Sequence, residues 1–276
     1  MAGKLFIVPT PIGNLGDITL RAIEALRGAD VVFCEDTRRS GLLLRHLGLR
    51  KPLRALFLGN ERERSEEALD MLKAGQTIAL ISDAGTPAIS DPGAGLIADA
   101  IAAGIEIEVL PGPQAILPAL LLSGLPPAPF CFAGFLPRRG GARRAALAEL
   151  AAIPWTLVLY EAPHRLKELL ADAADCLGDR PAAVVREISK LHEETLRGSL
   201  RSLRDAVAER ELRGEIAVVI GGRGAEHDPP PDLAAFVADS LARGLTPKDI
   251  ASAASVRGLR HRDAYNEALR QAKLGR

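Results

Sequence analysis

Short runs of apolar, often β-branched residues alternate along this chain with longer stretches rich in alanine and leucine. The longer stretches carry their apolar residues at helical spacing, so the short runs are predicted to be buried strands and the long stretches helices. This alternation is typical of parallel strands joined by crossover helices, and it predicts two α/β halves. The predicted strands lie near residues 4–8, 30–35, 53–57, 77–82, 105–109, 130–134, 155–160, 182–187 and 215–220. The predicted helices cover roughly 18–28, 40–47, 61–74, 93–103, 114–123, 141–151, 163–177 and 199–208.

Prolines and glycines mark the boundaries between the predicted domains. The segment 111–113 (PGP) follows an apolar strand, so we expect an N-terminal α/β domain over residues 1–112 and a second α/β domain over 113–226. Residues 228–231 (DPPP) predict a stiff linker, and residues 227–276 a helical C-terminal segment. Within that segment, Thr246 followed by Pro247 and Asp249 has the signature of a helix start.

Composition limits the ligands that the protein can attract and the compartment in which we expect it. Lys+Arg and Asp+Glu both number 35, so the chain carries no net charge and a polyanion would have to be held by local basic patches. The three cysteines are widely spaced, which predicts reduced thiols and a cytoplasmic protein. Residues 114–137 carry no charge, but Pro118, Pro126, Pro127 and Pro129 interrupt them. We therefore expect a short helix, a proline loop and a strand there, and no membrane span.

Several familiar reaction classes lack their motifs in this sequence. No P-loop and no G-x-S-x-G nucleophile elbow occur, and His192-Glu193 fails as a zinc motif because position 196 is leucine. Residues 93–98 (GAGLIA) match a loose dinucleotide fingerprint, yet they follow a long loop where that motif requires a tight turn. We expect no metal, and a reaction that depends on the positioning of two reactants.

Three loops follow predicted strands, at the end of a parallel sheet where ligands gather. Loop 9–17 (PTPIGNLGD) has a backbone that two prolines and two glycines shape for close approach, although a purely structural turn explains it equally well. Loop 82–93 (SDAGTPAISDPG) offers hydroxyls, carboxylates and free N–H groups to a polar ligand. Loop 111–115 (PGPQA) opens a helix whose first N–H groups are free, but by itself it is only a domain hinge.

Taken together, these segments resemble the tetrapyrrole methylase superfamily, and within it the branch that methylates ribosomal RNA. The resemblance covers nearly the whole chain. It departs from the tetrapyrrole enzymes, whose G-x-G-P-G-D opening and G-D-P loop are replaced here by PTPIG at 9–13 and SDAGT at 82–86, and this favours the ribosomal branch. The segments that carry it are 8–20 (VPTPIGNLGDITL), 34–38 (CEDTR), 81–93, 111–113, 132–137 (FAGFLP), 160–165 (YEAPHR), 186–187 and 190–194 (KLHEE).

The resemblance implies two α/β domains with S-adenosylmethionine in the cleft between them. It also implies 2′-O-methylation of a cytidine ribose in the decoding region of bacterial 16S rRNA, in the small ribosomal subunit, and a homodimer. Gln114 stands where many relatives have serine, so we expect a backbone contact there. The implied cofactor-binding residues are Pro11, Ile12, Asp83, Gly85, Thr86, Gln114, Ala115, Tyr160, Glu161, Arg186, Ile216 and Ala217.

Methyl transfer to a hydroxyl requires alignment of donor and acceptor and, at most, a weak base. The catalytic candidates are Glu161, Glu187, Lys190 and Glu193, with His192 as a further base and Arg186 as a further cation. A surface ion-pair network explains Glu187, Lys190 and Glu193 equally well.

RNA requires positive charge near the cleft. We expect contacts from Arg38, His164 and Arg165 at strand ends, and from a mobile basic loop over 138–144 that carries Arg138, Arg139, Arg143 and Arg144. Arg257, Arg260, His261 and Arg262 make the C-terminal segment a weaker candidate for RNA docking. Two alternatives stay open: a superfamily methyltransferase that acts on a tetrapyrrole or another small acceptor, and a non-enzymatic ribosome-assembly factor.

Overall fold

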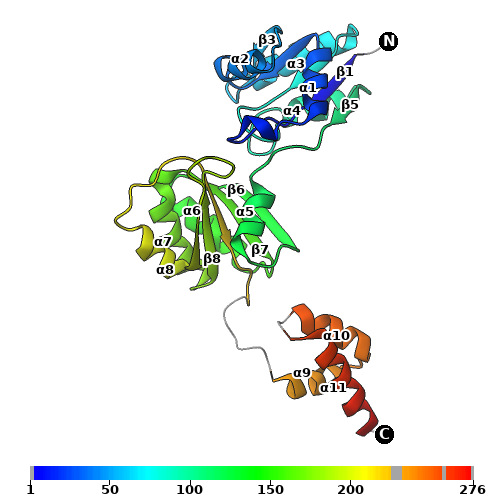
Figure 1. Cartoon of the computed structure of the whole chain (residues 1–276), viewed down its shortest axis with the longest axis vertical. Helices are drawn as coiled ribbons and strands as arrows, with labels where there is room; N and C mark the ends of the chain where they lie inside the picture. The colour runs from blue at the N-terminus through cyan, green and yellow to red at the C-terminus, as the bar shows by residue number, and fades with distance from the viewer. Residues whose placement is uncertain (1–2, 225–231, 257–258, 275–276) are drawn as a thin grey trace. The chain divides into compact units, whose positions relative to one another are not determined.

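The structure is a computed structural model that describes residues 3–224, 232–256 and 259–274. All strands of its first sheet run parallel. Its strand order is β3-β2-β4-β1-β5. Figure 1 draws this part of the chain in blue to green. Alternate residues of β1 face opposite sides, so that Leu5 and Ile7 enter one core cluster and Phe6 packs against another. The strands are β1 (Lys4–Ile7), β2 (Val31–Cys34), β3 (Leu53–Ala55), β4 (Ile78–Leu80) and β5 (Glu106–Val109); the helices are α1 (Leu20–Gly28), α2 (Thr37–His46), α3 (Glu61–Lys73) and α4 (Ala94–Ala102), with a short 3₁₀ turn η1 (Leu15–Asp17).

Because the strands of this sheet are parallel, their carboxyl ends meet at one edge. The loops after β1, β4 and β5 are therefore neighbours, as the sequence predicts. Thr10 and Gly85 exchange backbone hydrogen bonds of 2.9 Å, and the Thr10 hydroxyl donates to the Ser82 carbonyl over 3.0 Å. Loop 9–17 and loop 82–93 thus form one connected surface.

The second sheet differs from the prediction, because only β6 and β7 run parallel and every other pair is antiparallel. Its order is β6-β7-β10-β8-β9. The edge strand β9 was not predicted, because its sequence ETLRGS lacks the apolar alternation of a buried strand. The elements are α5 (Ile116–Ser123), β6 (Phe130–Phe135), α6 (Gly140–Leu150), β7 (Thr156–Glu161), η2 (Pro163–Arg165), α7 (Leu166–Leu177), β8 (Pro181–Arg186), β9 (Glu194–Ser199), α8 (Leu200–Val207) and β10 (Ile216–Ile220).

Helices cover both faces of this sheet. Helix α5 packs on one face through Ala119 and Leu120, while α6, α7 and α8 bury the other. The helix, proline loop and strand predicted over 114–137 are confirmed by α5 and β6. Among the described residues, no helix combines the length and the apolar character needed to cross a membrane.

The chain divides into two compact units, Met1–Arg223 and Gly224–Arg276. The second unit consists of α9 (Leu233–Ala242), α10 (Pro247–Val256) and α11 (His261–Leu274), which pack around Val237, Ile250 and Ala268. The predicted helix start is confirmed, because the Asp249 N–H donates to the Thr246 hydroxyl over 3.3 Å. The DPPP linker and Arg257 lie outside the described residues.

Candidate active site

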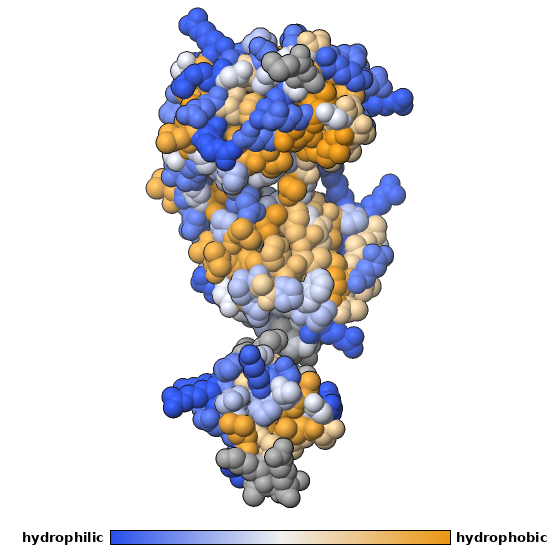
Figure 2. Space-filling view, turned by 90° about the vertical axis from the view of Figure 1, so that its right-hand side faces the viewer, coloured by the Kyte–Doolittle hydropathy of each residue, from blue (hydrophilic) through white to orange (hydrophobic). Residues whose placement is uncertain are grey.

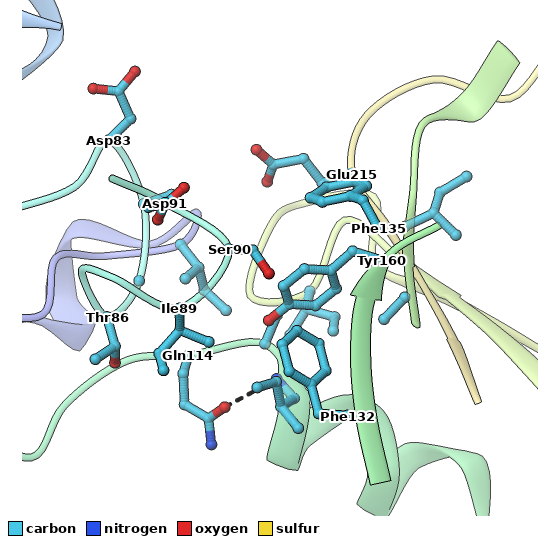
Figure 3. Close-up of a pocket in the computed structure, with 18 of the residues that line it drawn as sticks. Asp83, Thr86, Ile89, Ser90, Asp91, Gln114, Phe132, Phe135, Tyr160 and Glu215 are labelled. Carbon is cyan, nitrogen blue, oxygen red and sulfur yellow. Dashed lines mark hydrogen bonds between the residues drawn. The ribbon is translucent and has the colours of Figure 1, made fainter. Parts of the chain in front are cut away.

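A cavity of 980 Å³ lies between the strand-end loops of the first sheet and the second sheet (Figure 3). Loops 9–17, 82–93 and 111–115 form one side, and β6, β7 and the segment that leads into β10 form the other. Ten of the twelve implied cofactor-binding residues line it, namely Ile12, Asp83, Gly85, Thr86, Gln114, Ala115, Tyr160, Glu161, Ile216 and Ala217. Pro11 and Arg186 are not among the lining residues. Pro11 precedes the lining residue Ile12 in the chain, and Arg186 is the strand partner of the lining residue Ile216.

Loop 82–93 holds its shape through hydrogen bonds that end on neighbouring loops. Gly85 has a φ of 83°, in the left-handed region that favours glycine, and a Cβ there would lie 3.5 Å from the Ile12 side chain. The Thr86 hydroxyl donates to the Pro113 carbonyl over 3.3 Å, which joins this loop to loop 111–115. The backbone beside the cavity is therefore fixed before any ligand arrives.

Two strained tripeptides, 88–90 and 187–189, face the cavity from opposite sides. In each, the central isoleucine, Ile89 or Ile188, lines the cavity. Non-glycine residues with positive φ cost on the order of 1–3 kcal/mol each and persist where the surroundings enforce them, often at functional sites. The four strained residues are Ala88 (66°), Ser90 (67°), Glu187 (53°) and Ser189 (67°).

Gln114 caps the helix that begins behind it. Its side-chain oxygen accepts a hydrogen bond from the Ile116 N–H over 3.1 Å, the dashed line in Figure 3. The side-chain oxygen is therefore already engaged, which is consistent with the backbone contact expected at this position.

Carboxylates dominate the charged groups of the cavity. Glu35, Asp83, Asp91, Glu161 and Glu215 line it, and Arg39 is the single cation among the lining residues described. Burial, together with the negative charge of Glu35, raises the pKa of Asp91 to about 6. Burial also raises the pKa of Glu35, with Asp83 as the next cause. The cavity therefore favours a cationic ligand, and Asp91 has the pKa of a base suited to near-neutral pH.

Sequence reasoning assigned no role to Asp91, Glu35, Arg39 or Glu215. Asp91 was visible only as one of two aspartates within loop 82–93 that flank Gly85-Thr86-Pro87, and nothing local distinguishes it. The aromatic wall of the cavity, contributed by Phe130, Phe132 and Phe135 of β6, was equally unassigned. The pattern F-C-F-A-G-F was the available signal, because it places three phenylalanines on one short strand.

Of the catalytic candidates, only Glu161 lines the cavity, and its side chain is fully buried. Its carboxylate forms an ion pair of 3.2 Å with Arg165. Burial raises the pKa of Glu161, despite the Ala162 N–H that donates to it and the charge of Arg165. Glu161 is thus placed to hold Arg165 and the turn after β7.

Of the other candidates, Glu187 and Lys190 form an ion-pair network, which includes Glu215 in place of the expected Glu193. Lys190 donates to Glu187 over 2.8 Å and to Glu215 over 3.0 Å. Although burial opposes it, the hydrogen bond from Lys190 holds the pKa of Glu187 below its usual value. Glu193 is exposed and accepts the Ser189 N–H over 2.7 Å. Through Glu215, this network touches the cavity wall.

The expected mobile basic loop is wrong for residues 140–144, which begin helix α6. The Arg143 side chain is only 4% exposed, because its guanidinium pairs with Asp172 over 2.7 Å and with Glu168 over 3.1 Å. Arg144 pairs with Asp172 over 3.2 Å from a half-exposed position. Only Arg138 and Arg139 remain as exposed loop residues.

The strand-end candidates for RNA contact also include both exposed and mostly buried side chains. Arg38 is 89% exposed, although it pairs with Asp36 over 2.8 Å, and His164 is exposed. Arg165 is 13% exposed and also donates to the Leu136 carbonyl over 2.8 Å. Arg165 therefore stabilises the end of β6 and presents little surface to RNA.

A family model for tetrapyrrole (corrin/porphyrin) methylases matches residues 4–204, which include strands β1 to β9. The chain belongs to the tetrapyrrole methylase family. Its two sheets and the cavity between them are accordingly the fold of that family, as the sequence predicted. Among the described residues, no group of three or more His, Cys, Asp or Glu side chains is placed to hold a metal ion.

Relatives within the family match almost the whole chain. The ribosomal RNA small subunit methyltransferase I of Micromonospora olivasterospora is 47% identical over 244 residues, 88% of this chain and 78% of the relative. The protein of the same name from Escherichia coli O157:H7 is 43% identical over 273 residues, 98% and 96% of the two chains. Among solved structures, uroporphyrin-III C-methyltransferase of Thermus thermophilus, complexed with S-adenosyl homocysteine, has a TM-score of 0.55 at 22% identity, over 79% of this chain and 97% of that one. This last likeness concerns the fold.

Proposed function

We propose that this protein uses S-adenosylmethionine to methylate the 2′-hydroxyl of a cytidine in the decoding region of bacterial 16S rRNA. The observation that supports the use of this cofactor is the acidic cavity between the two sheets. The choice of rRNA is supported by the relatives named above, which are 43–47% identical to this chain. The 2′-hydroxyl of a cytidine rests on the resemblance of loops 9–17 and 82–93 to the ribosomal branch.

The cavity residues fit the chemistry of this cofactor. S-adenosylmethionine supplies a methyl group on a sulfonium sulfur and carries an ammonium group, and both cations suit a cavity lined by five acidic side chains. Gly85 leaves backbone open for close approach, with Ile12 beside it. Thr86, Gln114 and Ala115 offer main-chain groups from loops that are already ordered, and Tyr160, Ile216 and Ala217 offer the opposite wall. Pro11 and Arg186 act by supporting these lining residues.

In the proposed mechanism, Asp91 accepts the proton of the ribose hydroxyl. Bound S-adenosylmethionine would supply the methyl group to the acceptor oxygen and would keep the electron pair of the broken carbon–sulfur bond on sulfur. The O–H proton goes to the Asp91 carboxylate. A carboxylate with a pKa of about 6 is ionised at neutral pH and still basic enough to receive this proton. Lys190 and Glu187 position Glu215, Glu161 positions Arg165, and Glu193 holds the Ser189 turn; these four are positioning residues in this scheme.

The proposed RNA contacts lie on exposed arginines outside the cavity. Arg138, Arg139 and Arg38 are exposed, and with Arg144 and His164 they offer positive or neutral donors to phosphate. Arg143 and Arg165, being buried in ion pairs, support that surface from within.

The proposal includes a homodimer acting in the cytoplasm. Exposed apolar side chains give a surface that a second copy would cover, and the space-filling view shows such side chains grouped in orange (Figure 2). Leu117 and Leu121 of helix α5 are exposed by 48% and 70%. Sedimentation of the purified protein tests this part separately.

The central experiment incubates the protein with methyl-labelled S-adenosylmethionine and either assembled small subunits or naked 16S rRNA, and then digests the RNA to nucleosides. Label in 2′-O-methylcytidine is expected. Label in any other nucleoside overturns the acceptor, and inhibition by uroporphyrinogen would favour a tetrapyrrole acceptor. Calorimetry that detects no cofactor binding would favour an assembly factor without catalysis.

A further inference from the structure

Three aromatic rings from β6 and β7 support one another on the wall of the cavity. The Phe132 and Tyr160 rings lie 4.9 Å apart at 68°, and the Phe135 and Tyr160 rings 5.6 Å apart at 57°. These are the edge-to-face and tilted geometries that aromatic pairs prefer. Tyr160 is therefore held on one side by Phe132 and holds Phe135 on the other, and Figure 3 shows the three rings together.

Phe135 is the exposed member of this group. Its side chain lines the cavity and yet is 56% exposed, whereas Phe132 and Tyr160 are half-buried. An exposed ring that two neighbouring rings hold in place can receive a planar group with little loss of side-chain entropy. Phe135 is also the last residue of an edge strand, where a polymer can reach it without entering the sheet.

The opposite side of this space is formed by the strained tripeptide 88–90. Ile89 lines the cavity with 45% of its side chain exposed, and Figure 3 shows Ser90 pointing toward Tyr160. Gly134 permits this approach, because a Cβ at that position would lie 3.2 Å from the Ser90 hydroxyl oxygen. Loop 82–93 of the first sheet thus comes close to the aromatic wall of the second sheet through Ser90.

Charge separates the inside of the cavity from its rim beside Phe135. Arg138 and Arg139 follow Phe135 by three and four residues and are exposed. Inside, the partly buried Asp91 and Glu35 oppose the entry of phosphate groups. A nucleic-acid strand would therefore keep its phosphates at the rim, and only an uncharged part of a nucleotide would pass the aromatic wall.

We propose that Phe135 is the stacking platform for a nucleobase swung out of the ribosomal RNA. The inference rests on the proposed function and specifies how its substrate is held. RNA-modifying enzymes gain access to a target nucleotide by unstacking it, and aromatic side chains replace the lost stacking. On this basis Phe135 holds the base while the ribose of the same nucleotide reaches Asp91.

The test compares wild type with Phe135→Ala and Phe135→Trp, with Phe57→Ala as the matched control. Phe57 is 46% exposed and lies outside the set of residues that line the cavity. For each protein, the KM for unmethylated small ribosomal subunits, kcat and the calorimetric Kd for S-adenosylmethionine are measured. Phe135→Ala is expected to raise KM about tenfold or more, since base–aromatic stacking contributes that much, and to leave the cofactor Kd within twofold. Phe135→Trp and Phe57→Ala are expected to keep the wild-type KM.

An unchanged KM in Phe135→Ala overturns the inference and leaves the proposed function standing. A parallel weakening of the cofactor Kd also overturns it, because the ring would then contact the adenine of the cofactor. A wild-type protein that transfers no methyl group to the subunits refutes the proposed function, and this inference with it. Thermal unfolding of all four proteins confirms that each is folded at the assay temperature.

Discussion

The Asp83 carboxylate accepts the backbone N–H of Asp36 over 3.0 Å, and so connects the loop after β4 to the loop after β2. Its second oxygen lies 3.4 Å from the Arg39 guanidinium. In Figure 3 this carboxylate points away from the other labelled side chains. Asp83 therefore shapes the cavity wall chiefly by tying two loops together.

This bond makes Asp83→Ala and Asp83→Asn different substitutions. Removal of a charged acceptor from a half-buried N–H is expected to lower the free energy of unfolding by about 1–2 kcal/mol in Asp83→Ala. Asp83→Asn keeps an acceptor oxygen and should retain most of that stability. Urea unfolding measures both, and equal losses in the two variants would contradict the role assigned to the hydrogen bond.

Asp91 predicts how activity changes with pH. Its pKa is raised to about 6, so the carboxylate is protonated below that value and cannot accept the ribose proton. We expect kcat to fall about tenfold for each pH unit below 6, and to be nearly flat from pH 7 to 8. Asp91→Asn should be slow throughout and lose this dependence; an Asp91→Asn profile that matches wild type would exclude Asp91 as the base.

The raised pKa of Asp91 makes folding stability change with pH in the opposite sense to activity. Because the folded pKa of Asp91 lies above its usual value of 3.8, the folded state binds the proton more tightly than the unfolded chain. The stabilisation from Asp91 is complete below pH 4 and is lost as pH rises through 6. Asp91→Asn is therefore expected to be more stable than wild type at pH 7, with the difference shrinking toward pH 4 in thermal unfolding.

Gly85 predicts a conformational cost at the centre of the site. An alanine there would have to adopt a φ of 83°, which costs roughly 1–2 kcal/mol for an L-residue, although no neighbour comes closer than 3.5 Å. Gly85→Ala should lower the melting temperature and weaken S-adenosylmethionine binding. Gly141→Ala is the control, since a Cβ there meets nothing within 4 Å and helix α6 gains a better helix former. A loss of stability in Gly141→Ala equal to that in Gly85→Ala would refute the conformational explanation.

Arg143 is expected to stabilise the fold, whereas Arg139 is expected to contact RNA. Arg143→Ala leaves the Asp172 carboxylate, 13% exposed, without its 2.7 Å partner, and is expected to lower the free energy of unfolding by about 3 kcal/mol. Arg139→Ala should leave stability unchanged and weaken binding to small subunits, more at low salt than at high salt. Filter binding at two salt concentrations, together with urea unfolding, distinguishes the two arginines; the reverse pattern would contradict this assignment.

The sequence by itself determined the elements that depend on local pattern. Apolar runs such as 4–8 and 77–82 identify the parallel strands, and the small residues that follow them identify Thr10, Gly85 and Gln114 as parts of strand-end loops. These features are local because a strand needs a continuous apolar run and a sharp loop needs glycine or proline.

Tertiary structure alone decided which of the charged and aromatic side chains face the cavity. Arg143 looks like any other arginine of a basic segment until Asp172, 29 residues later in the chain, is brought against it. Asp91 acquires its raised pKa from burial and from the charge of Glu35. Phe135 is exposed at the end of β6, which lies at an edge of its sheet. Burial and charge at these positions are properties of distant segments in contact, and therefore no local stretch of sequence carries them.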